Sequence, residues 1–318
     1  MRLPLRSSLI AAVIGFLPCM AKGGPPEIWF SPQSGSVEYM KLFEPDAPWQ
    51  QAASYVKVFQ LTPRRIRTDS DADLAKLFAW LNEHHIELAQ STGLIPPHPG
   101  FKHTEGVDGD QAAMAARIQR LGGRLAYVAA DEPLWFGHGS HIPGAYQLSV
   151  AELAEGAAVS ARAFQKVFPD VRIVEDEPIS NFTDPGWMDD LGQFLAAFRK
   201  AYGQPMAAVR MDIAWWFPEP WKPRALAFAK YLHGIGEPVG VIYDGNSKDS
   251  SDAEWLGNAQ KNYTAYETLV GSAPDEVIFQ SWVPHPTHLL PESSSEAFTH
   301  LILQYESGRQ VIGAGAAR

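Results

Sequence analysis

The stretch YVAADEPLWFGHGSH, which spans Tyr127–His141, passes from an apolar run directly into two adjacent acids, a proline, a tryptophan and two histidines. A second stretch, VRIVEDEPISNF (Val171–Phe182), repeats the pattern: a Val/Ile-rich run again ends in Asp-Glu-Pro. Continuous apolar runs rich in β-branched residues are typical of parallel strands buried on both faces. The repeat therefore predicts two equivalent strands that end in acids at the same edge of a sheet.

The whole chain contains eight such runs, so we expect eight strands. Most of the runs are continuously apolar and do not alternate strictly, which favours strands in a parallel sheet. The expected strands span Glu27–Ser31, Tyr55–Leu61, Ile86–Ser91, Arg124–Ala130, Val171–Glu175, Ala207–Ala214, Val239–Asp244 and Val277–Trp282.

Helical patterns lie between the runs. Apolar stripes with a spacing of three and four residues begin at Leu74 and at Met114. Capping boxes, in which a Ser and a Glu three residues later satisfy each other's amides, predict three helix starts: Ser149 with Glu152, Ser251 with Glu254, and Ser293 with Glu296. Further helices are expected over Trp49–Ser54, Trp187–Tyr202 and Pro223–His233.

Strand and helix alternate about eight times, which predicts an α/β fold with a single (β/α)8 barrel, the TIM barrel. An open doubly wound sheet is the alternative, but it would need a Gly-rich phosphate loop after its first strand, and SPQSGS is not one. The loops that follow strands are long and rich in Pro, Trp and His, whereas those that precede strands are short. In barrels this asymmetry marks the carboxyl-terminal face as the functional one.

The first 21 residues differ from the rest. Arg2 and Arg6 precede an apolar run that ends near Ala21, so we expect residues 1–21 to be a signal peptide, followed by the barrel over 22–306 and a tail over 307–318. A membrane anchor would need roughly 20 uninterrupted apolar residues, and Pro18 interrupts this run. The only cysteine, Cys19, lies inside the segment, so the mature protein would hold no thiol. We expect a secreted or periplasmic protein with no membrane contact after cleavage.

The chain of 318 residues is 46% hydrophobic and 19% charged, which is enough apolar material for a large core. Its formal net charge is −10, and its only basic cluster is PRRIR at Pro63–Arg67. Nucleic acid is therefore not an expected partner, because phosphate binding relies on a basic face. We expect a monomer.

Acids concentrate where the expected strands end, and in a barrel those ends surround one mouth. Carboxyl groups crowded together raise one another's pKa, which keeps a general acid protonated near neutral pH. For each acid singly, the alternative is a loop cap or an ion pair with arginine. The candidates are Asp131, Glu132, Asp176, Glu177, Asp212 and Asp244.

Aromatic residues accompany these acids and indicate a substrate. Flat rings beside carboxylates form platforms for sugars, whose C–H faces stack while their hydroxyls bond the acids. The alternative for these rings is core packing above the barrel, as we expect for Trp80 and Trp255. The expected substrate-binding set is Asp131, Trp135, Asp176, Trp215, Trp216, Tyr243 and Trp282, with Phe136, Trp187 and Phe217 nearby.

This layout resembles the clan-A-like (β/α)8 glycoside hydrolases. The resemblance implies that Glu132, after the fourth strand, is the acid/base, that Asp244, after the seventh, is the second carboxylate, and that Trp282 is the aromatic after the eighth. Members usually have Asn before the acid/base and Glu as the second carboxylate, where this chain has Asp131 and Asp244. Glu177 and Asp212 therefore compete for the second role. The implied activity is glycoside hydrolysis of a poly- or oligosaccharide by paired carboxylates, without a cofactor or metal.

Two other functions remain open at this point. Histidines in the long loops, together with strand-end acids, suit a metal-dependent barrel hydrolase. The histidines in question are His138, His141, His285 and His288. A non-catalytic glycan-binding barrel would keep the aromatics and use the acids only to bond hydroxyls.

Overall fold

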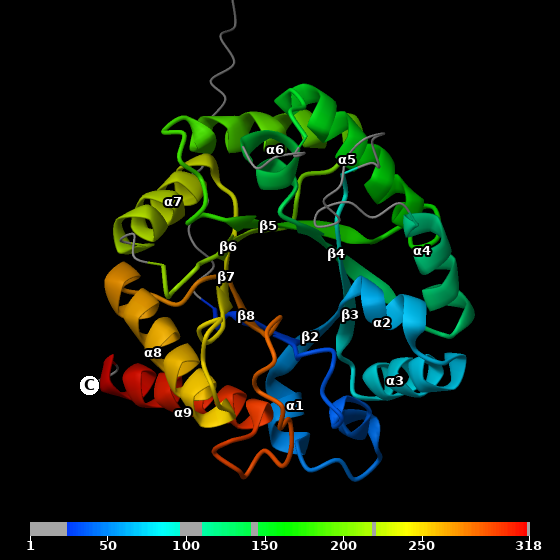
Figure 1. Cartoon of the computed structure of the whole chain (residues 1–318), viewed down its shortest axis with the longest axis vertical. Helices are drawn as coiled ribbons and strands as arrows, with labels where there is room; N and C mark the ends of the chain where they lie inside the picture. The colour runs from blue at the N-terminus through cyan, green and yellow to red at the C-terminus, as the bar shows by residue number, and fades with distance from the viewer. Residues whose placement is uncertain (1–23, 96–109, 141–145, 218–220, 317–318) are drawn as a thin grey trace, which may run out of the picture.

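The computed structural model describes residues 24–95, 110–140, 146–217 and 221–316. Eight parallel strands form a closed barrel in sequence order, and β8 pairs with β1 to complete the ring (Figure 1). This confirms the predicted (β/α)8 fold, and every predicted strand is present with its ends shifted by a few residues. The strands are β1 (Glu27–Ser31), β2 (Val56–Leu61), β3 (Glu87–Thr92), β4 (Leu125–Asp131), β5 (Arg172–Pro178), β6 (Val209–Asp212), β7 (Val239–Tyr243) and β8 (Glu276–Gln280).

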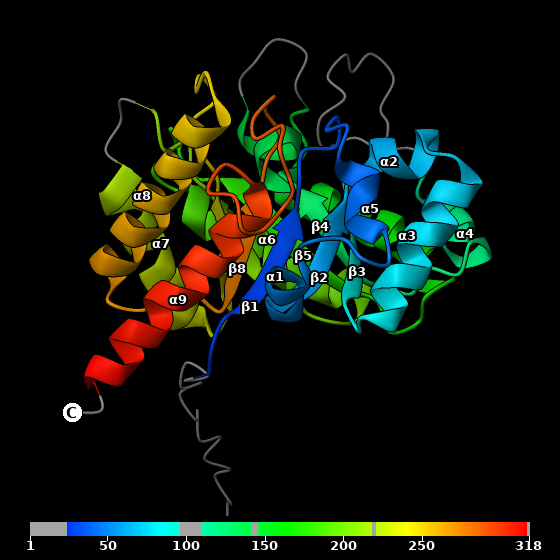
Figure 2. The same cartoon turned by 90° about the horizontal axis from the view of Figure 1, so that it is seen from below.

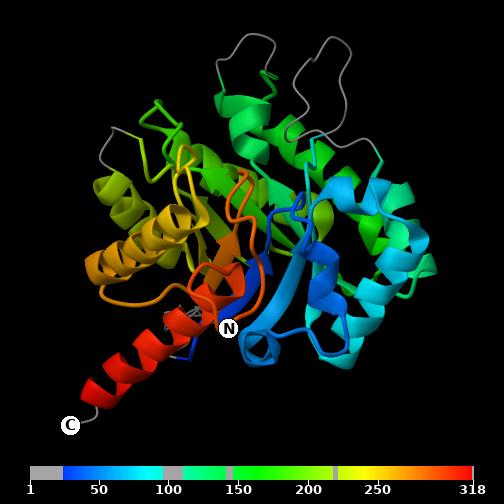
Figure 3. The same cartoon turned by 60° about the horizontal axis from the view of Figure 1, so that its bottom comes forward.

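Helices surround the barrel, as the side view in Figure 2 shows. They are α1 (Gln50–Tyr55), α2 (Pro63–Thr68), α3 (Asp71–Glu83), α4 (Gln111–Arg120), α5 (Val150–Gln165), α6 (Trp187–Tyr202), α7 (Trp221–Ile235), α8 (Asp252–Val270) and α9 (Phe298–Ala316), with short helical turns η1 (Tyr39–Phe43) and η2 (Trp135–Gly139). Figure 3 shows α9 beside α8, and α9 also contacts α1, so the last helix joins the two ends of the ring. α9 continues through most of residues 307–318, which were predicted to be a tail.

The predicted helix starts are only partly correct. Ser149 and Glu152 form the full capping box of α5. The Ser251 side chain accepts the Glu254 amide and so caps α8. The Glu254 carboxylate, however, accepts from the Ser250 amide and not from that of Ser251. The box predicted at Ser293 and Glu296 is wrong. There Ser294 accepts the Glu296 amide within a series of turns, and the helix begins only at Phe298.

Successive residues of a strand point alternately into the barrel and out towards the helices. The interior cluster contains two large rings, Trp29 and Tyr127, among small or medium side chains: Val58, Ala89, Ala129, Val174, Ala208, Ile242 and Ile278. The side chains in between belong to the larger core that packs the strands against the helices.

A buried arginine crosses the interior. The Arg210 guanidinium lies 3.7 Å above the centre of the Trp29 ring and donates from Nε to Glu276 Oε2 at 2.7 Å. Its Nη1 reaches Gln60 Oε1 at 3.2 Å. Gly240, on the next strand, makes room for it, because a Cβ there would lie 2.5 Å from Arg210 Cγ. The barrel interior is thus filled by side chains, with one cation among them.

Within the described residues, no helix is both long and apolar enough to cross a membrane. The predicted signal peptide lies outside those residues.

Candidate active site

Two acids of the repeated triplets lie side by side inside the barrel. Asp131 on β4 and Asp176 on β5 are register partners. Both side chains are on the inward face of their strands, because Ala129 and Val174, which lie two residues earlier, belong to the interior cluster. The prediction that the two triplets meet at one edge is therefore confirmed for their first acids.

Asp176 is 3% exposed and lies 3.4 Å from Arg210 Nη1. Burial raises its pKa, and the arginine opposes that rise. Glu276, the other carboxylate on Arg210, behaves in the same way. Arg210 therefore balances part of the negative charge below the mouth.

Asp212 and Asp244 end the next two strands on the same inward side. Asp212 pairs in register with Pro178, and Asp244 follows the interior residue Ile242 by two positions. Burial and then the charge of Asp176 raise the pKa of Asp212 to about 7. Burial and then Asp212 raise the pKa of Asp244 well above its ordinary value. Near neutral pH this pair therefore retains a proton.

The indole groups of Trp215 and Trp282 lie close enough to Asp244 to lower its pKa in part. Asp244 Oδ1 and Trp215 Nε1 nevertheless have no hydrogen-bond partner of normal geometry among the described residues. Asp244 is only 2% exposed. Asp244 Oδ1 is therefore a buried acceptor, which a substrate hydroxyl reaches only if the side chains around it move.

Glu132 leaves the strand in an unusual backbone conformation. Its φ is +51°, which is in the left-handed region that side chains other than glycine rarely adopt. Its amide donates to the Asp176 carbonyl at 3.0 Å, and its own carbonyl accepts from Phe136 at 3.0 Å. The side chain is partly exposed at the end of β4. Glu132 is thus held at the rim by a fixed main chain.

Glu177 does not join this group, which corrects its prediction as a mouth residue. It pairs in register with Met211, a member of the outer core, so its side chain points away from the barrel interior. Glu175 likewise pairs with outward-facing Val209. Both are fully buried, and the Glu177 carboxylate accepts from the backbone amides of Leu134 and Trp135.

Two tryptophans from different loops face each other beside the acids. The ring centres of Trp216 and Trp282 are 5.8 Å apart with an interplanar angle of 52°. Trp282 is 55% exposed, the largest exposure of any tryptophan that the structure describes, while Trp216 is partly buried. Trp215 is 7% exposed and packs edge-on against Trp221. Trp216 and Trp282 thus form a platform, and Trp215 forms part of a wall.

The remaining predicted platform residues are packed in the core to different degrees. Tyr243 is fully buried on the outer side of β7 among Tyr263, Tyr266 and Tyr305, so its prediction as a substrate-binding residue is corrected. Trp187, predicted near the platform, stacks on Phe182 and is 7% exposed. Trp135 is partly exposed and meets the Phe182 ring edge-on. Trp80 and Trp255 are buried, as predicted.

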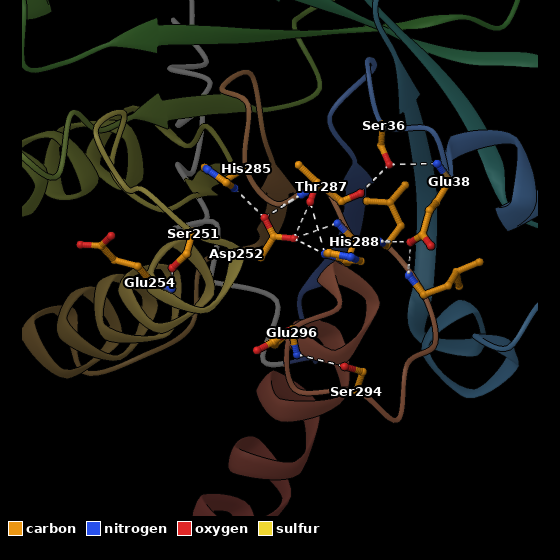
Figure 4. A network of polar contacts seen from close by, with 12 residues as sticks. Ser36, Glu38, Ser251, Asp252, Glu254, His285, Thr287, His288, Ser294 and Glu296 are labelled. Atoms are coloured by element: carbon orange, nitrogen blue, oxygen red, sulfur yellow. Dashed lines mark hydrogen bonds and ion pairs between the residues drawn. The ribbon is translucent and has the colours of Figure 1, made fainter.

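The histidines proposed as metal ligands make other contacts. His138 Nδ1 lies 2.6 Å from the Leu148 carbonyl. His285 and His288 both contact Asp252, at 2.6 Å each (Figure 4). His141 lies outside the described residues. Within those residues, no group of three or more His, Cys, Asp or Glu side chains is arranged to hold a metal ion.

Asp252 organises the loop that carries Trp282. Besides the two histidines, its carboxylate accepts from the amides of Thr287 and His288 and from the Thr287 hydroxyl (Figure 4). These contacts and the backbone amides lower the pKa of Asp252, although burial opposes the shift. Asp252 is a residue that the sequence did not predict, because the pattern of Ser251 and Glu254 around it indicates only a helix start.

Solved structures of several kinds of enzyme share this fold. A GH10 protein from Paenibacillus barcinonensis matches with a TM-score of 0.52 and 14% identity, over 87% of this chain and 94% of that one. A truncated 3-deoxy-D-arabino-heptulosonate 7-phosphate synthase from Thermotoga maritima matches with a TM-score of 0.50 and 11% identity, over 91% and 88%. Xylanase 10B from Thermotoga petrophila matches at 0.48 and 11%, over 81% and 84%. No family model matches the sequence, and no curated protein is significantly similar to it.

Proposed function

We propose that this protein is a glycoside hydrolase that acts on a poly- or oligosaccharide. The observation that carries the proposal is the group of inward carboxyls at the ends of four consecutive strands, next to the Trp216 and Trp282 platform. Aromatic faces bind sugar rings, and carboxyls both bond hydroxyls and perform the acid and base steps. The likeness to solved structures contributes the fold alone, which glycosidases share with other enzymes.

In this proposal Glu132 protonates the leaving glycosidic oxygen. It is placed at the rim by a rigid strand end, as a proton donor requires. The Asp212 and Asp244 pair supplies the second carboxylate, with Asp212 carrying the negative charge first because its pKa is about 7. Asp244 is buried beside it, with a pKa raised well above its ordinary value, and takes the charge only if substrate binding rearranges the side chains that cover it.

A screen of polysaccharides with detection of new reducing ends tests the activity. On an active glycan, Glu132→Gln should lower turnover by at least about a hundredfold, the usual contribution of a general acid. Substrates with activated aryl leaving groups should lose much less, because they need little protonation. Whichever of Asp212 and Asp244 is the second carboxylate, its replacement by asparagine should lower turnover of both substrate types.

Near-normal turnover by Glu132→Gln on a natural glycan would show that Glu132 is not the acid. Oligosaccharide binding without any turnover over long incubation would instead favour the glycan-binding barrel. Activity that is lost on treatment with a chelator would favour the metal-dependent hydrolase. Melting temperatures of all variants separate loss of chemistry from loss of fold.

A further inference from the structure

The second acidic triplet holds the segment that follows the first one. Glu177 is fully buried on the outer side of β5, and its two carboxylate oxygens receive two amides from the neighbouring chain segment. The Leu134 amide donates to Oε1 at 2.6 Å and the Trp135 amide to Oε2 at 3.1 Å. The contact therefore crosses from β5 to the residues directly after Glu132 and Pro133.

These two amides need an acceptor from outside their own segment. The chain turns into a short helical segment after Pro133, and the first amides of such a turn have no partner within it. Pro133 itself has no amide hydrogen to donate. A carboxylate that accepts both amides fixes the position and the direction of this first turn.

That turn also fixes the backbone of Glu132, whose carbonyl accepts from the Phe136 amide within it. A side chain other than glycine at a φ of +51° is strained by about 1–3 kcal/mol and persists only where its surroundings hold it. Three of the described contacts hold this backbone: the Glu132 amide donates to the Asp176 carbonyl, the Phe136 amide donates to the Glu132 carbonyl, and the Glu177 carboxylate accepts the two amides just beyond. Of these three contacts, the last is the one that a side chain makes.

We propose that Glu177 is a positioning residue, whose carboxylate accepts the Leu134 and Trp135 amides and thereby fixes the backbone that carries Glu132 at the end of β4. The inference rests on the glycosidase function proposed above. Glu177 touches no substrate, because it faces away from the interior, and it acts only through the main chain.

Glu175 is a second buried carboxyl beside Glu177. It is two residues earlier on the same strand, equally buried and on the same side, but it accepts neither amide. Burial raises the pKa of Glu175 to about 8, and burial followed by the charge of Glu175 raises the pKa of Glu177 well above its ordinary value, while the Leu134 and Trp135 amides oppose that second rise. The two carboxyls therefore retain at least one proton near neutral pH, and the two amides favour the form of Glu177 in which both oxygens accept.

Glu177→Gln tests the proposal, because it keeps the volume but replaces one acceptor oxygen by an amino group that faces a backbone amide. We expect turnover of a glycan with a poor leaving group to fall about tenfold or more, with KM nearly unchanged. Turnover of the matching activated aryl glycoside should fall less than about threefold. A purely structural role would lower both substrates alike.

Glu175→Gln is the matched control. It changes an equally buried carboxyl on the same strand whose oxygens accept neither amide, so the ratio of the two turnovers should stay at the unmodified protein's value. If Glu177→Gln does not fold, Glu177→Asp keeps the charge but falls short of the amides, and the same selective loss is expected.

Glu132→Gln run in parallel separates the two proposals. If Glu132→Gln loses turnover mainly on the glycan with the poor leaving group and the Glu177 variants do not, the positioning role is overturned and the glycosidase proposal stands. If Glu175→Gln changes the ratio of glycan turnover to aryl glycoside turnover as much as Glu177→Gln does, the positioning role is also overturned. If neither Glu132→Gln nor the Glu177 variants discriminate between leaving groups, the acid assignment fails and the positioning role fails with it.

Discussion

Asp131 and Asp176 are register partners on neighbouring strands, and both follow interior positions. Two acids of the same sign would normally be kept apart, but here Arg210 lies beside Asp176 and the mouth is otherwise acidic. Burial, and after it the charge of a neighbouring aspartate, raises the pKa values of Asp212 and Asp244.

Trp282→Ala should weaken oligosaccharide binding by about 1–3 kcal/mol while leaving the fold intact, because the ring is 55% exposed and faces Trp216 across the platform. Calorimetric titration at fixed pH measures the change. Trp135→Ala is the comparison, since that ring packs edge-on against Phe182 and should cost stability more than affinity. Unchanged affinity in Trp282→Ala would rule out the platform.

Asp212→Asn should stabilise the protein at pH 8. The folded pKa of about 7 lies above the unfolded value of about 3.9, so the folded state takes up a proton more readily than the unfolded state. Stability therefore falls as pH rises from about 4 to about 7, and asparagine removes that loss. We expect a gain of at least about 1 kcal/mol at pH 8, or about 2 °C in Tm, that disappears near pH 4. A lower Tm at pH 8 would contradict the burial of this charge.

Asp252→Asn should destabilise the protein by about 2–4 kcal/mol, because Oδ2 alone accepts from the Thr287 hydroxyl and from both the amide and ring of His288, and an amino group there accepts nothing (Figure 4). Chemical denaturation measures the loss. Glu254→Gln, an exposed cap at the same helix end, should destabilise the protein much less. Equal losses would mean that Asp252 matters only as a cap.

His288 should make the same loop sensitive to pH. Its hydrogen bond to Asp252, assisted by the charges of Glu38 and Glu296, raises its pKa in the folded state. The protonated ring stabilises the folded state fully below the unfolded-state pKa of about 6.5, and this stabilisation is lost as pH rises through the folded-state pKa. His288→Gln should remove this step from the Tm profile while leaving the acidic limb set by Asp252. A step of unchanged size would assign the titration to another group.

The mature protein is predicted to begin near Lys22, because the apolar run from Leu9 to Ala21 follows two arginines and stops at a Pro- and Gly-rich segment. Mass spectrometry of material exported from a bacterial host measures the end directly. An exported chain that still contains residues 1–21, or that carries a lipid on Cys19, would disprove this processing.

The strands could be predicted because each is an apolar run with a polar end, and the barrel followed from their number and from the helices between them. The side on which each acid lies could not. In VRIVEDEP, Glu175 and Glu177 share the face of Ile173, while Asp176 shares the face of Val174. Both faces of a barrel strand are apolar, so the sequence does not tell which one is the interior. The two glutamates were therefore placed at the mouth with the aspartates.

A lone arginine in the apolar run AAVRMDIA was the available signal for the interior charge. Arg210 has partners on three other strands, Gln60, Asp176 and Glu276, and their spacing along the chain contains no pattern that predicts the contact. The Asp252 network depends in the same way on a loop more than thirty residues away. Local patterns thus find helix ends and strands, whereas contacts that close across the barrel require the assembled fold.

The fit between Gly240 and Arg210 restricts how this sequence can have diverged. A methyl group at 240 would collide with the Arg210 stem, and a shorter residue at 210 would leave Glu276 and Asp176 as buried charges without a counterion. Neither position can change first without loss, so lineages that retain the arginine should retain the glycine, and those that replace one should have replaced all four residues together. The four residues are thus expected to change as a unit, because Gly240, Asp176 and Glu276 each accommodate the same arginine.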